Sequence, residues 1–240
     1  MLRKGFVLFL VSFALILAPK VAQTHDFWIE KKNGNFWVIH GHDGKPEEYD
    51  PSRVIEVKAF GVNGKVIPVK TNVNENGFFF VPKKQAYAVT VTFDNKYWVK
   101  TTDGWKNIGK VDALKESLNV IESGRSFKFS KYIEKWSDTF KRPLGTEMEV
   151  IPLKNPLNLK IGDTLPIKVV YNGRPVSDVS ITINWSHDEK AKTDTNGFVN
   201  VAVEKTGLNL VSAKTKVPIE NDPNADIMYL NATLVFEVKQ

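Results

Sequence analysis

Cysteine is absent from the 240 residues of this chain, and histidine occurs only four times. A chain without cysteine forms no disulfide and offers no thiol nucleophile, zinc–thiolate site or cysteine-ligated iron–sulfur cluster. Stability must then come from buried apolar side chains, and a chain of this length can bury a substantial core.

Long apolar runs are also scarce. Phe6–Ala18 is a thirteen-residue uncharged run interrupted only by Ser12, and Arg3 and Lys4 precede it. Small residues follow in Val21–Thr24. This order predicts a secretory signal peptide over residues 1–24, cut after Thr24 so that His25 becomes the N-terminus. The run is shorter than the roughly 20 residues of a membrane-spanning helix. We therefore expect a periplasmic protein.

The positive charge of the chain comes largely from that leader. The formal net charge of +6 falls to +3 once Arg3, Lys4 and Lys20 are removed. Lysine and arginine do not cluster with aromatic residues in the remainder, so nothing in the pattern favours nucleic acid as a partner.

Motifs of known enzyme classes are missing as well. The sequence contains no G-x-S-x-G, S-x-x-K or H-E-x-x-H motif and no glycine-rich phosphate loop. Acidic pairs such as Glu47-Glu48 are adjacent in sequence, so on a strand they point to opposite faces. We expect a protein without enzymatic activity.

What the chain does contain is the alternation of β-strands. Asn63-Gly64 lies between two apolar segments, as in a tight hairpin, and Tyr87–Phe93 alternates large apolar residues with alanine and threonine. Lys106–Trp136 is more polar, and Phe127–Phe140 is predicted to be a short helix or an irregular crossing segment. This gives an N-terminal β domain over residues 25–150 with a helical or irregular excursion in the middle.

The remaining residues, 151–240, show the same pattern more clearly. Asn172-Gly173 is a second hairpin signal, and every second residue of Met228–Val238 is apolar. Short strands separated by turn signals predict a β-sandwich of immunoglobulin- or transthyretin-like outline. The predicted fold class is therefore all-β, with two β-sandwich-like domains.

The histidines are the candidate functional residues. His25, His40 and His42 fall within eighteen residues, with Asp26 beside the first. A processed His25 would offer its α-amine and its imidazole, and His40 and His42 would lie on one face of a strand. Such ligands suit nickel, cobalt, copper or zinc, and the residue types do not choose among these metals. The alternative is that His40 and His42 are ordinary surface residues, and His187 is expected to be a turn residue rather than a ligand.

Several segments together resemble one exported family. They are His25-Asp26-Phe27-Trp28 directly after the leader, Tyr49–Pro51, Val57–Phe60, Trp98–Asn107, Leu144–Leu153, Asn172–Val176 and Thr193–Gly197. The chain is similar to the exported family of unknown function described as the periplasmic component of cobalt or nickel uptake (ABC-type) systems. The resemblance implies a protein that binds nickel or cobalt, or that assists a membrane metal transporter. Of the matched positions, only His25 and Asp26 are candidate ligands.

The leading hypothesis is thus a periplasmic transition-metal binding accessory of an uptake system, with His25, Asp26, His40 and His42 as the metal ligands. A second hypothesis is a non-enzymatic cell-envelope interaction module that binds a protein or polysaccharide partner. A copper enzyme with an N-terminal histidine ligand is a third, supported by no further pattern.

Overall fold

The computed structural model describes residues 25–239. The predicted signal peptide, residues 1–24, lies outside the described residues. Within residues 25–239, none of the helices has the length and apolar character needed to cross a bilayer.

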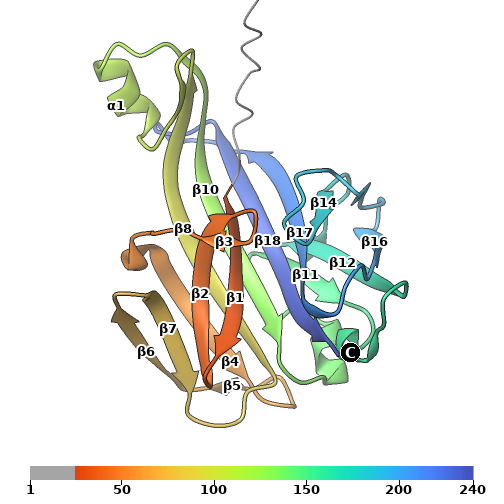
Figure 1. Ribbon diagram of the computed structural model, residues 1–240. Helices are drawn as coiled ribbons and strands as arrows, with labels where there is room; N and C mark the ends of the chain where they lie inside the picture. Colours follow the sequence, from red (N-terminus) through yellow and green to blue (C-terminus); the bar gives the residue numbers. More distant parts are fainter. Residues whose placement is uncertain (1–24, 240) are drawn as a thin grey trace, which may run out of the picture.

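Three β-sheets make up most of the described chain (Figure 1). The largest, called here the long sheet, has nine strands in the order β15-β14-β17-β18-β10-β8-β4-β5, with β9 paired to β8. Its strands are β4 (Val54–Phe60), β5 (Val66–Ile67), β8 (Ala88–Thr101), β9 (Gly104–Lys106), β10 (Val120–Ile133), β14 (Ser180–Ile183), β15 (Ala191–Lys192), β17 (Gly207–Pro218) and β18 (Ile227–Val238). The neighbours β10 and β18 run parallel, and the other pairs in this sheet are antiparallel.

Two smaller sheets complete the fold. The five-stranded N-terminal sheet has the order β1-β2-β7-β6, with β3 paired to β2, and comprises β1 (Asp26–Lys32), β2 (Asn35–His42), β3 (Lys45–Pro46), β6 (Val69–Asn74) and β7 (Gly77–Pro82). The four-stranded C-terminal sheet comprises β11 (Met148–Pro152), β12 (Thr164–Tyr171), β13 (Arg174–Pro175) and β16 (Phe198–Ala202). Helical segments are short: α1 (Lys110–Lys115), η1 (Pro51–Arg53), η2 (Asp138–Lys141) and η3 (Pro156–Asn158).

The small sheets cover opposite faces of the long sheet. Leu210 belongs to the core under the N-terminal sheet, whereas its neighbour Val211 belongs to the core under the C-terminal sheet. Val235 and Leu234 on β18 divide in the same way. Successive residues of a strand point to opposite faces, so both faces of the long sheet are buried. The prediction of an all-β protein built from β-sandwiches is confirmed.

The edge strand β1 packs directly against the long sheet. Residues Asp26–Ile29 are all buried although β1 has a strand partner on one side only. The Thr233 hydroxyl donates to the Phe27 carbonyl at 2.9 Å, and the Lys128 ammonium donates to the His25 carbonyl. Side chains of the long sheet thus satisfy backbone groups that an edge strand otherwise leaves unpaired.

Hairpin turns occur at the dipeptides that the sequence singled out. Asn172 and Gly173 both have positive φ, at 50° and 73°, and connect β12 to β13. Gly64 has φ 73° in the turn between β4 and β5, where the Asn63 side chain accepts from the Lys65 amide. Asparagine and glycine tolerate this backbone region, which explains their place here.

One local prediction is wrong in part. Phe127–Ile133 is not a helix or an irregular segment, because these residues belong to β10, a central strand of the long sheet, whereas residues 134–137 are irregular and Asp138–Phe140 lie in the 3-10 helix η2, as predicted. Lys128 and Lys131 are buried there, at 4% and 2% exposure. These lysines occupy buried positions of the strand, where the sequence pattern of a strand predicts apolar residues. The only described α-helix, α1, lies earlier, and η2 covers Asp138–Lys141.

The division of the chain at residues 150 and 151 stays a prediction. Strands from both parts contribute to the long sheet, with β10 and β18 paired over ten residues from Gly124↔Ile227 to Ile133↔Phe236.

A buried ion pair joins the centre of this sheet to the C-terminal sheet. Lys131 on β10 pairs with Glu149 on β11, and their side chains are 2% and 1% exposed. Glu149 also accepts hydrogen bonds from the backbone amides of Leu144 and Gly145, at 2.8 and 3.1 Å. The carboxylate therefore holds both a cation and a loop.

We expect Lys131→Met to lower the free energy of unfolding by about 3–5 kcal/mol, because it leaves a buried carboxylate without its cation. Urea denaturation measures this loss. Lys70→Met, at an exposed position of β6, is the matched control and should change stability by less than about 0.5 kcal/mol. A loss below about 1 kcal/mol in Lys131→Met would contradict the stabilising role of the pair.

Candidate metal centre

All four histidines of the chain lie in one row. The ring centroids of His187 and His42 are 4.9 Å apart, those of His42 and His25 are 6.2 Å apart, and those of His25 and His40 are 4.8 Å apart. The row begins with His187, on the loop between β14 and β15, and ends with His40, which is buried in the core under the N-terminal sheet.

Strand pairing places three of these histidines together. In the antiparallel register of β1 and β2, Phe27 pairs with His40 and Asp26 pairs with Gly41, so His25 arrives next to His42. His40 and His42 are two residues apart on β2 and therefore point to one face. Gly41 allows the close approach of β3, since a Cβ at this position would lie 2.0 Å from the Lys45 carbonyl oxygen.

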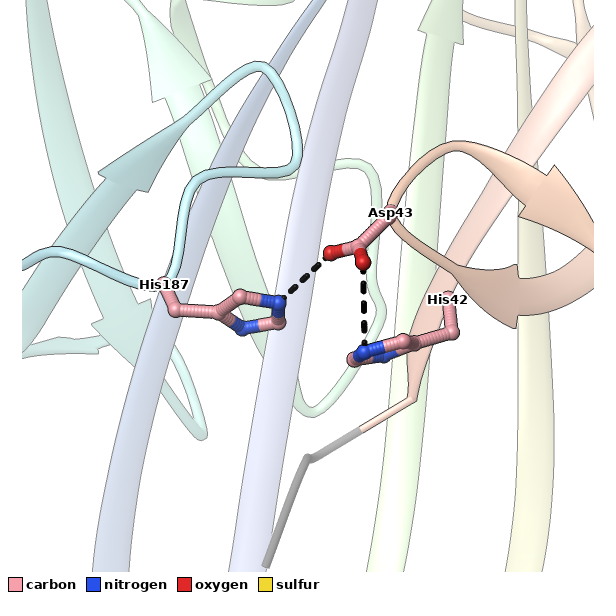
Figure 2. A group of neighbouring side chains, drawn as sticks. All are labelled: His42, Asp43 and His187. Carbon is pink, nitrogen blue, oxygen red and sulfur yellow. Dashed lines mark hydrogen bonds and ion pairs between the residues drawn. The ribbon is translucent and has the colours of Figure 1, made fainter. Parts of the chain in front are cut away.

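A tight turn presents the acidic member of the site. Asp43 and Gly44 connect β2 to β3 and have φ of 50° and 73°, as in the hairpin turns that favour Asp-Gly. The turn projects the Asp43 carboxylate between two imidazoles (Figure 2). Its Oδ1 lies 2.7 Å from His187 Nε2, and its Oδ2 lies 3.5 Å from His42 Nε2.

The loop between β14 and β15 delivers His187. Asn184 and Trp185 both have positive φ, at 51° and 64°, a conformation that is costly for a bulky side chain. Asn184 is fixed to Leu210 on β17, because its amide donates to the Leu210 carbonyl at 2.8 Å and its side-chain oxygen accepts from the Leu210 amide at 3.1 Å. Trp185 in turn packs over Gly44, with the nearest ring atom 3.3 Å from where a Cβ would be. The two loops thus hold each other.

His42, Asp43 and His187 together can offer ligand atoms that all lie within 4.8 Å of one another. In a tetrahedral site with metal–ligand distances of about 2.1 Å, ligand atoms are about 3.4 Å apart. Small side-chain rotations would bring the ligand atoms from their present separations of up to 4.8 Å to this spacing. Among the described residues, neither ring nitrogen of His42 has a hydrogen-bond partner although both are buried. Buried polar atoms without a partner are rare and call for an explanation.

The two remaining histidines differ in exposure. The His25 side chain is 41% exposed, and its Nε2 lies 2.9 Å from Oε2 of Glu47. His40 is 9% exposed, stacks on Phe93 at 5.6 Å between centroids, and has a buried Nδ1 that no described residue contacts by a hydrogen bond.

Desolvation lowers the pKa of two of the imidazoles. Burial lowers the pKa of His40 to about 3, and burial is also the main cause that lowers the pKa of His25, against the opposing effect of Glu47. The hydrogen bond from His187 is the main cause that lowers the pKa of the exposed Asp43 carboxyl. Neutral imidazoles and an ionised carboxylate are the forms that bind metals.

Behind the row lies a set of buried charges. Asp26 is 3% exposed, and desolvation raises the pKa of its carboxyl despite the Lys214 ammonium 3.8 Å away. Lys128 is 4% exposed, and burial lowers its pKa to about 7. Asp26 thus lies near two lysines and outside the three-residue cluster.

The candidate ligands predicted from sequence divide accordingly. The structure brings His25, His40 and His42 together and places Asp26 in the lysine set behind them. Sequence reasoning left out Asp43 and His187 as ligands. The Asp43-Gly44 turn signal could have indicated Asp43, but nothing local indicates that His187 returns to it across 144 positions.

The depressed pKa of His40 predicts a pH-dependent stability in the metal-free protein. An unfolded histidine titrates near 6.5, so unfolding takes up a proton below that pH, and stability falls as the pH drops from about 6.5 towards 3. Between pH 7 and pH 5 we expect the unmodified protein to lose about 1–2 kcal/mol more than His40→Phe, measured by urea denaturation in the presence of a chelator. The raised pKa of Asp26 has the opposite effect on stability as the pH falls, but Asp26 is present in both proteins, so this contribution cancels in the comparison. Equal losses would contradict the burial of His40.

Comparisons with known proteins bear on the family alone. A search of curated proteins gives no significant match. Among solved structures, one described as the D0-D1 domain of Intimin is 17% identical, covers 89% of this chain and 98% of its own, and superposes with a TM-score of 0.22. That score is too low to support an argument. The domain of unknown function DUF4198 matches residues 22–217, and the chain therefore belongs to the DUF4198 family.

Proposed function

We propose that this protein is an exported, periplasmic carrier of a transition-metal ion that serves a nickel or cobalt uptake system. The metal is cargo, held by His42, Asp43 and His187 and, once the leader is removed, by the imidazole and α-amine of His25. The observation that carries the proposal is the state of His42: its two ring nitrogens are buried and make no hydrogen bond with a described residue, and Nε2 has only the 3.5 Å contact with the Asp43 carboxylate.

The chemistry of this donor set supports the proposal. Imidazoles bind nickel, cobalt, copper and zinc well, and a single carboxylate adds the charge that compensates a divalent ion. No thiolate is available, because the chain has no cysteine. The exposed Asp43 and His187 side chains, at 56% and 41%, leave a path for an ion to enter and for a membrane partner to remove it.

The three-residue cluster predicts the first test. Calorimetric titration of the chain beginning at His25 with nickel, cobalt, copper and zinc should show one tight site for at least nickel or cobalt. In His42→Ala/His187→Ala we expect affinity to fall by at least about 100-fold, since two imidazole ligands are lost. Asp188→Asn is the matched control, because Asp188 is exposed beside His187 but outside the cluster. Unchanged affinity in the double variant, or no binding of any of the four metals, would contradict the proposal.

The role of the processed N-terminus predicts a second test. One additional alanine before His25 converts its α-amine into an amide and so removes the amine–imidazole chelate of a single residue, while the His25 imidazole stays in place. We expect about a 10-fold or greater loss of affinity, measured in the same titration. The same addition in His25→Ala should also lower affinity, because that variant lacks the imidazole but keeps the α-amine of residue 25. Equal affinities with and without the extra residue would remove the α-amine from the ligand set.

A further inference from the structure

A cavity of about 520 Å³ opens beside the histidine row. Its lining residues lie on the long sheet, apart from His25, which comes directly before the start of β1. Its lining comes from strands β8, β9, β10, β17 and β18 and from His25.

The cavity has the size of a small-molecule site and exceeds what a hydrated ion needs. Ligand sites typically enclose about 300–1,000 Å³. Six waters at roughly 30 Å³ each occupy about 180 Å³, so a hydrated metal ion would fill about a third of this space. The volume therefore fits an ion together with an organic ligand.

Charge in the cavity is of one sign. Three lysines, Lys128, Lys214 and Lys216, are among its lining residues, and no lining residue in the described part of the chain is acidic. The Lys216 ammonium pairs with the Glu122 carboxylate at 3.0 Å. The Lys214 ammonium lies 3.8 Å from the carboxylate of Asp26, which is not part of the lining. Lys128 donates to the His25 carbonyl and has no ion pair with a described residue. Burial lowers the pKa of Lys128 to about 7, and an anionic ligand beside it would favour the charged ammonium. Lysines recognise carboxylates by charge-assisted hydrogen bonds.

Part of the lining is aromatic, and Tyr229 lies beside Lys216, whose Nζ is 5.1 Å from the ring centroid. Trp105 meets Tyr229 edge to face, with centroids 5.9 Å apart. Trp98 is held by its indole N–H, which donates to the Asn95 carbonyl at 2.7 Å. Half-buried aromatic side chains with fixed orientation favour planar apolar groups.

His25 connects this cavity to the metal centre, because it lines the cavity and lies in the row with His42 and His40. We propose that the cavity binds the organic part of a metal chelate, a small planar carboxylate whose metal ion is bound at the same time by His25. The inference rests on the proposed function and names its cargo: a metal–carboxylate complex rather than a free ion. The ligand carboxylates lie towards Lys128 and Lys214, and its ring lies against Trp105.

The test uses dipicolinate, a planar pyridine with two carboxylates that chelates nickel. The chain beginning at His25 is titrated by calorimetry with nickel alone, with dipicolinate alone and with their 1:1 complex, and tryptophan fluorescence is followed in parallel. We expect the complex to bind as a unit, at least about 10-fold more tightly than dipicolinate alone, and to quench tryptophan emission. Trp105→Ala and Lys214→Met should each weaken binding of the complex about 10-fold and leave binding of nickel alone unchanged.

Matched controls are Trp136→Ala and Lys70→Met, which truncate a half-buried tryptophan and an exposed lysine outside the cavity. These should bind the complex as the unmodified protein does. Removal of protein-bound nickel by dipicolinate without a ternary complex would overturn the inference and leave the proposed function standing. Equal binding of dipicolinate with and without nickel would also overturn it. Failure of both nickel and the complex to bind would overturn the two proposals together.

Discussion

The proposed metal centre depends on the pairing of β1 with β2 while β1 is docked on the long sheet. That register sets His25 beside His42 and puts His40 in the core. It is held from below by hydrogen bonds from Thr233 and Lys128 to the Phe27 and His25 carbonyls. A slip of one residue would turn each side chain of β1 to the other face and separate the row.

The position of His187 depends on a loop in the C-terminal half of the chain. The β14–β15 loop carries Trp185 at φ 64° and meets the β2–β3 turn, where Gly44 leaves room for the indole ring. Backbone strain of this kind costs about 1–3 kcal/mol and persists only when the surroundings impose it. Here the surroundings are the two hydrogen bonds of Asn184 to Leu210 on the long sheet. The β14–β15 loop and the β2–β3 turn, which are far apart in sequence, thus hold His187 against Asp43. Burial lowers the pKa of His25 and His40 near them.

Much of this architecture could be predicted from sequence, for local reasons. The alternation in Met228–Val238 and the turn dipeptides Asn63-Gly64 and Asn172-Gly173 report strands and hairpins directly, since they act within a few residues. Phe127–Ile133 was missed because Lys128 and Lys131 are buried, and their burial depends on the His25 carbonyl and on Glu149, more than a dozen residues away. His187 was missed as a ligand for the same reason. Its nearest partner, Asp43, is fixed by tertiary packing, which single-sequence patterns do not report.

The most direct measurement of the central claim is X-ray absorption at the nickel edge on the nickel-loaded chain beginning at His25. The account predicts nitrogen and oxygen neighbours only, with the multiple-scattering pattern of at least two imidazoles, and one imidazole fewer in His187→Asn. A spectrum of oxygen neighbours without imidazole scattering, or one unchanged by His187→Asn, would contradict a metal centre built from this histidine row.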